Sequence, residues 1–201
     1  MGAVRSHPVL AAIVAVGLAV ALRLGASPTR AAPEEGAGRY ARTTVRYAIP
    51  DVVLVNQDGA PVALPALLSG TAPVVVSFMF TTCATTCPVT MAAVRRLRED
   101  LGADAATLRV VAITLDPDHD RPAVLADYAR RHESVAGWEF LTGTPDAIAT
   151  VLQAFGASTG RRADHRPLVL LRTPNRPDWV RIDGLTSAAD LAREYRRLLG
   201  G

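Results

Sequence analysis

An almost continuously apolar run from Val74 to Phe80 restricts the possible folds of this chain more than any other feature. A run of this length suits a central strand that is covered on both faces, as in a mostly parallel sheet. The residues from Pro88 to Leu101 place apolar side chains at helical spacing, and Gly102 supplies a stop. A buried strand followed by an amphipathic helix therefore predicts an α/β fold.

The rest of the chain continues this alternation of strand and helix patterns. Further strands are predicted at residues 51–55, 62–64, 108–115, 138–141, 167–171 and 179–182, and further helices at 121–132, 145–155 and 187–199. A right-handed strand–helix–strand unit, followed later by an antiparallel hairpin and a closing helix, is the thioredoxin pattern. We expect a thioredoxin-like fold with a central mixed β-sheet flanked by helices, in which residues 121–155 carry an inserted helix and strand.

The N-terminal segment has the form of an export signal. Arg5 precedes an apolar run from Val9 to Leu22, and a basic flank followed by such a run is typical of signal peptides. The run is about fourteen residues, shorter than the roughly 20 that a spanning helix needs. Residues 1–26 are therefore predicted to be a signal peptide or a membrane anchor, 27–43 a linker, and 44–201 the folded domain. The positive-inside rule then places the domain outside the cytoplasm, in the periplasm or on the outer face of the membrane.

The charge pattern argues against nucleic acid as a partner. The net charge is +3 and all basic residues are arginine, scattered among acidic residues. Aromatic residues make up 5% of the chain, too few for a platform on which bases stack.

The chain has two cysteines, Cys83 and Cys87, between the predicted strand and the predicted helix. Open α/β sheets bind ligands at the carboxyl ends of their strands. A helix N-terminus also favours thiolate over thiol, and we expect this effect to be largest at Cys87. The pair could share a soft metal ion, act as a redox pair or form a structural disulfide.

A third metal ligand is expected from topology. The strand that starts at Pro167 should run antiparallel to the central strand, which returns His165 to the edge that carries the cysteines. Two thiolates and one imidazole suit Cu(I) in a trigonal site and can also hold Cu(II), whereas a structural zinc site usually has a fourth protein ligand. Cys83, Cys87 and His165 are therefore predicted to bind one copper ion per chain.

Asp116 follows the strand at 108–115 and should lie at the same edge, either supporting the metal ligands or capping a turn before Pro117. His119 and His132 are expected to face solvent. Met79 and Met91 fit core positions better than thioether ligands.

Several motifs, in order along residues 45 to 199, resemble the SCO/SenC family of copper chaperones. These motifs are Phe80-Thr-Thr-Cys83, Cys87-Pro88, Thr114-Leu-Asp116-Pro117 with Asp120 and Pro122, Trp138-Glu-Phe-Leu-Thr-Gly143 and Asp164-His165. The resemblance implies a thioredoxin-like fold behind an N-terminal anchor, and copper held by Cys83, Cys87 and His165. It also implies a metallochaperone that helps assemble the binuclear copper centre of cytochrome c oxidase, with the copper-centre subunit or another copper or thiol protein as its partner. Some members of the family act mainly as thiol-disulfide reductants, so the resemblance leaves a reductase activity open.

One departure from the family pattern keeps a second function open. Many family members have proline after the first cysteine, where this chain has Ala84. This change leaves the ligands intact but can alter loop rigidity and redox potential. The alternative is a membrane-tethered thiol-disulfide oxidoreductase that uses Cys83 and Cys87. A peroxidase of related fold is a distant third possibility. Such enzymes usually need an arginine that supports the reactive cysteine, and no arginine lies near Cys83 in the sequence.

Overall fold

A computed structural model describes Gly2 and residues 40–132, 137–158, 160, 164–174 and 176–200. Apart from Gly2, the predicted signal or anchor at residues 1–26 lies outside this part of the chain. Among the helices in the described ranges, none has both the length and the apolar character needed to cross a bilayer.

The described residues form a mixed sheet with the strand order β1-β8-β7-β4-β5-β6-β2-β3. β4 pairs in parallel with β5, β5 pairs in parallel with β6, and β7 is antiparallel to both β4 and β8. The mixed thioredoxin-like sheet is therefore confirmed. The strands are β1 (Tyr40–Val45), β2 (Val53–Asn56), β3 (Pro61–Ala63), β4 (Val74–Met79), β5 (Arg109–Thr114), β6 (Trp138–Thr142), β7 (Leu168–Arg172) and β8 (Trp179–Gly184).

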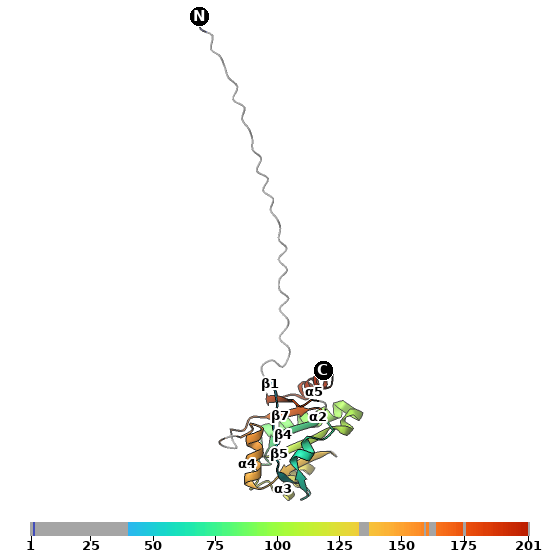
Figure 1. The fold of residues 1–201 in the computed structure, drawn as a ribbon, viewed down its shortest axis with the longest axis vertical. Helices are drawn as coiled ribbons and strands as arrows, with labels where there is room; N and C mark the ends of the chain where they lie inside the picture. The colour runs from blue at the N-terminus through green and yellow to red at the C-terminus, as the bar shows by residue number, and fades with distance from the viewer. Residues whose placement is uncertain are drawn as a thin grey trace. The chain divides into compact units, whose positions relative to one another are not determined.

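Helices cover both faces of this sheet. Figure 1 shows α2 and α5 on one side of the strands and α4 on the other. The described helices are α1 (Leu64–Leu68), α2 (Thr86–Leu101), the 3₁₀ helix η1 (Gly102–Thr107), α3 (Pro122–Arg131), α4 (Pro145–Ala154) and α5 (Ala188–Gly200). All residues of β4 are buried. Val75 and Met79 belong to the core under α2 and α5, whereas Val76 and Phe78 belong to the core under α4. This burial on both faces explains why β4 is apolar at nearly every position.

Several local signals are confirmed. The hairpin β2–β3 turns at Gly59, whose φ is +81°, and Oδ1 of Asn56 accepts hydrogen bonds from the backbone N–H groups of Asp58 and Ala60. Oγ1 of Thr144 accepts from the N–H of Ala147 and caps α4. Gly102 ends α2 with a φ of +54°.

Two boundaries differ from the sequence prediction. β1 begins at Tyr40, inside the range 27–43 that was predicted as a linker, and pairs along its length with β8. This strand is mostly exposed at the sheet edge, so it carries no apolar alternation that a sequence pattern could detect. α2 begins at Thr86, two residues before the predicted first position Pro88. Cys87 therefore lies inside the helix.

Candidate metal centre

The cysteines occupy the connection from the central strand to α2, as predicted. β4 ends at Met79 and α2 begins at Thr86, which places Cys83 in the loop and Cys87 in the first turn. Both are free thiols, Cys83 partly exposed and Cys87 buried. The two residues are in contact, since the backbone N–H of Cys87 donates to Sγ of Cys83 at 3.4 Å.

Cys83 is the residue that the loop activates. Burial would raise the pKa of its thiol, but hydrogen bonds from the N–H groups of Cys87 and Thr85 and from the side chains of Cys87 and Thr86 outweigh burial. Together they lower the pKa of Cys83 to about 6. Near neutral pH Cys83 is therefore a thiolate that solvent can reach.

Cys87 behaves in the opposite way. Burial and donation of its S–H to the Cys83 sulfur raise the pKa of Cys87 to about 12. The expectation that the helix N-terminus would favour thiolate most at Cys87 is therefore wrong. The orphan N–H of Cys87 points at the Cys83 sulfur, so the helix terminus stabilises its neighbour's charge.

Asp120 holds the start of this loop, a role that sequence reasoning missed. Its carboxylate is fully buried and accepts hydrogen bonds from the N–H and hydroxyl of Thr81 and, at 2.5 Å, from the hydroxyl of Thr114. It therefore ties the end of β5 to the residues that precede Cys83. The sequence does contain a signal for this role, because Asp116 and Asp120 both follow a buried strand that ends at the edge of the sheet where the cysteines lie.

Asp116 is buried and forms the turn that delivers Asp120. Its N–H donates to Oγ1 of Thr114, and its carbonyl accepts from the N–H groups of His119 and Asp120. These backbone hydrogen bonds place Asp116 in a turn, which is one of the two roles predicted for it.

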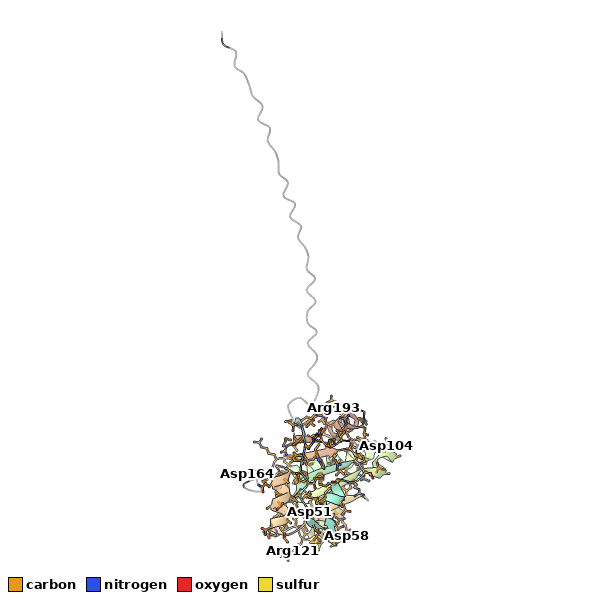
Figure 2. All side chains as sticks on the ribbon, in the orientation of Figure 1. Asp51, Asp58, Asp104, Arg121, Asp164 and Arg193 are labelled. Atoms are coloured by element: carbon orange, nitrogen blue, oxygen red, sulfur yellow. The ribbon has the colours of Figure 1, made fainter. Side chains whose placement is uncertain are left out.

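His165 lies at the predicted edge of the sheet. Its Nε2 is 3.1 Å from the carbonyl oxygen of Phe78, near the end of β4. Because a carbonyl can only accept, Nε2 carries the proton and Nδ1 keeps a lone pair. Burial lowers the pKa of His165, which favours the neutral, metal-binding form. The preceding residue, Asp164, lies at the margin of the domain in Figure 2.

The structure brings the two sulfurs together and places His165 at the end of the same strand. Within the ranges described, it shows no cluster of three or more His, Cys, Asp or Glu side chains arranged to hold a metal ion. His165 instead borders a separate cavity of about 230 Å³ whose lining includes Arg181 and Asp183. The donor types fit a soft cation, since one thiolate, one thiol and one neutral imidazole are present.

The other histidines and the methionines are also located. His119 is exposed, as predicted. His132 is only partly exposed and stacks on Tyr128 with ring centroids 4.1 Å apart, so its solvent-facing interpretation needs correction. The reason is the spacing of four residues, which stacks the two rings on one face of the helix. Met79 and Met91 are buried in the core, as predicted.

A mixed sheet flanked by helices, with a reduced Cys-x-x-x-Cys pair at the start of α2, defines a thioredoxin-like thiol protein. The SCO1/SenC family profile matches residues 44–200. The chain belongs to the SCO1/SenC family.

Known proteins agree with this assignment. A relative named SCO1 protein homolog from Bacillus subtilis (strain 168) is 31% identical over 107 residues, which are 53% of this chain and 54% of the relative. The chain thus spans about half the length of the curated relatives it matches.

Solved structures agree in fold. The structure of yeast Sco1 with copper bound is similar with a TM-score of 0.64 and 20% identity, over 78% of this chain and 95% of the yeast chain. The structure of BsSco is similar with a TM-score of 0.63 and 24% identity, over 79% of this chain and 96% of BsSco. BsSco is described as a member of the Sco family of cytochrome c oxidase assembly proteins, in which a disulfide switch was identified.

Proposed function

We propose that this protein carries one copper ion, bound by Cys83, Cys87 and His165, and delivers it to the binuclear copper centre of cytochrome c oxidase. The observation that carries this proposal is the state of the donors at one sheet edge. Cys83 is a thiolate with a pKa of about 6, and the proton of His165 lies on Nε2, which leaves Nδ1 as a donor. Both groups are ready to bind a soft cation without first losing a proton.

Uptake begins at Cys83, because it is the more exposed and the deprotonated sulfur. Binding at Cys83 withdraws the negative charge to which Cys87 donates its S–H. Cys87 then loses its proton as it becomes the second ligand, so copper uptake releases a proton near neutral pH. His165 completes the trigonal site with its unprotonated Nδ1.

Delivery requires no catalytic turnover. The partial exposure of Cys83 lets an acceptor's own thiolate or imidazole exchange with it, after which the ion leaves by stepwise ligand exchange. Residues 1–26 act in this scheme as an export signal or anchor that places the domain outside the cytoplasm, next to a membrane-bound oxidase. Asp116 supports the ligands through the turn that it forms.

His165→Ala tests this proposal, with His119→Ala as the matched control because His119 is exposed. The Cu(I) affinity of each reduced protein is measured against a chromophoric Cu(I) chelator, with zinc in competition. We expect the affinity of His165→Ala to fall at least about 100-fold, since loss of a ligand exceeds the 10–100-fold effect of losing a supporting partner. Affinities that agree within about twofold for wild type and His165→Ala would remove the three-ligand site.

A thiol-disulfide reductase remains the second candidate, because the two cysteine pKa values are far apart. The Cys83 thiolate would attack one sulfur of a substrate disulfide, form a mixed disulfide and release the other sulfur as a thiolate. Cys87 would then lose its proton and attack Cys83, so that the substrate gains two electrons and the Cys83–Cys87 disulfide forms. His165→Ala leaves this exchange intact, which separates the two functions.

A further inference from the structure

The face of α2 that continues from Cys87 forms one wall of a cavity. Pro88, Met91, Ala92 and Arg95 recur at intervals of three and four residues, so they share one face of the helix. With Arg131 and His132 at the end of α3, they line a cavity of about 150 Å³. Pro88, which lines this cavity, directly follows Cys87 in the chain.

The cavity lining combines apolar and basic side chains. Pro88, Met91 and Ala92 contribute apolar surface, whereas Arg95, Arg131 and His132 contribute basic groups. The imidazole of His132 stacks on Tyr128 at 4.1 Å, which fixes its position. Burial and the neighbouring Arg131 lower the pKa of His132, so the two arginines carry the positive charge at neutral pH.

The ion pair between Arg95 and Glu99 lies close to solvent. Arg95 contacts Glu99 at 3.2 Å, but both side chains are about four-tenths exposed, at 39% and 44%. An ion pair this exposed contributes little and exchanges readily. Arg131, which also lines the cavity, is exposed. Two guanidinium groups beside an apolar surface complement a carboxylate on a short aliphatic side chain.

We propose that this cavity docks an acidic segment of the partner protein, with one Glu or Asp side chain seated between Arg95 and Arg131. The proposal deepens the function proposed above, on which it rests in one respect: it assumes that the partner reacts with Cys83. A carboxylate held at the third turn of α2 lets the adjoining partner residues extend over the first turn and the loop, where Cys83 is partly exposed. Charge complementarity of this kind acts chiefly on the rate and selectivity of encounter.

The test uses the whole reduced protein and a pair of defined probes. Two synthetic capped peptides carry one cysteine as a mixed disulfide with thionitrobenzoate, flanked by three glutamates in one peptide and three glutamines in the other. Release of thionitrobenzoate by Cys83 is followed by stopped flow at pH 7 and low salt. We expect the glutamate peptide to react about tenfold faster than the glutamine peptide.

Arg131→Glu and Arg95→Glu should each abolish this preference. Arg109→Glu makes the same change of charge at an exposed residue at the opposite end of the sheet, where Arg109 pairs with the first residue of β4. This control should retain the preference. Arg131→Gln, which removes the charge without reversing it, should give an intermediate value, and its far-ultraviolet circular dichroism checks that the fold is intact.

Three results would overturn the proposal. The preference could survive in both cavity variants, or disappear equally in Arg109→Glu, which would assign it to net charge. Inorganic phosphate could suppress the preference far more than chloride of equal ionic strength, which would indicate a small-anion site instead of a protein-docking site. Copper affinity is not part of this readout, so a failed His165→Ala test would leave the docking result unchanged.

Discussion

The candidate centre has a cysteine half and a histidine half, and each is held by a largely buried charged side chain. Asp120 holds the first and Arg181 the second. On the cysteine side, the carboxylate of Asp120 accepts from both the N–H and the hydroxyl of Thr81. On the histidine side, the guanidinium of Arg181 donates to the carbonyls of Phe155 and Gly156 at 2.8 and 3.2 Å. An acceptor therefore fixes one loop, and a donor fixes the other.

The two anchors differ in how close they come to the ligands. Thr81 lies two residues before Cys83, so Asp120 fixes the loop next to the sulfur. Arg181 instead fixes the segment that follows α4, well before His165 in the chain. The sulfur half of the site is therefore built by contacts close to it, whereas the imidazole half depends on strand pairing and on more distant contacts.

Asp120→Ala should produce the largest effect on the cysteine half. The substitution leaves the N–H and hydroxyl of Thr81 and the hydroxyl of Thr114 without their charged acceptor in a buried site. We expect the free energy of unfolding of the reduced protein to fall by about 3 kcal/mol, measured by urea denaturation. Asp118→Ala, an exposed neighbour in the same turn, should change it by less than about 0.5 kcal/mol. Equal losses in the two variants would refute the anchoring role.

Arg181→Met should have a smaller effect that is confined to the histidine half. The variant keeps the apolar stem but removes the donors to Phe155, Gly156 and Asp183. We expect about 1–2 kcal/mol of lost stability and a roughly tenfold lower Cu(I) affinity, as for a supporting partner. Alkylation of Cys83 should stay within about twofold of wild type, with the exposed Arg46→Met as control. A change in alkylation as large as the change in copper affinity would show that the two halves are not independent.

The two cysteines should also differ in how their alkylation depends on pH. The pKa of Cys83 is lowered to about 6, so its thiolate prevails above pH 6 and is lost as the pH falls through that value. The alkylation rate should rise roughly tenfold between pH 5 and pH 7 and then level off. In Cys83→Ser, burial still raises the pKa of Cys87, so this remaining thiol should be almost unreactive below pH 9. Mass spectrometry of the labelled peptides gives both rates, and a midpoint near pH 9 for Cys83 would contradict the hydrogen bonds described for this loop.

Much of the architecture could be predicted from local patterns. The buried strand β4, the turn at Gly59, the cap at Thr144 and the hairpin of β7 and β8 each follow from a few neighbouring residues. β1 could not be predicted in this way, because its exposed side chains carry no apolar signal and its place is set by pairing with β8. In the site, topology was enough to place His165 at the end of β4, but not to find its bond to Phe78.

A strand–loop–helix unit that presents two sulfurs at one sheet edge could be predicted from the sequence, because spacing and apolar periodicity are properties of consecutive residues. Which sulfur carries the charge could not be predicted from the sequence and is set by tertiary contacts. That choice depends on which thiol the packing of α2 buries and on which backbone N–H groups point at the other. Such differences in solvation and hydrogen bonding arise from contacts in space, and these separate the pKa values of Cys83 and Cys87.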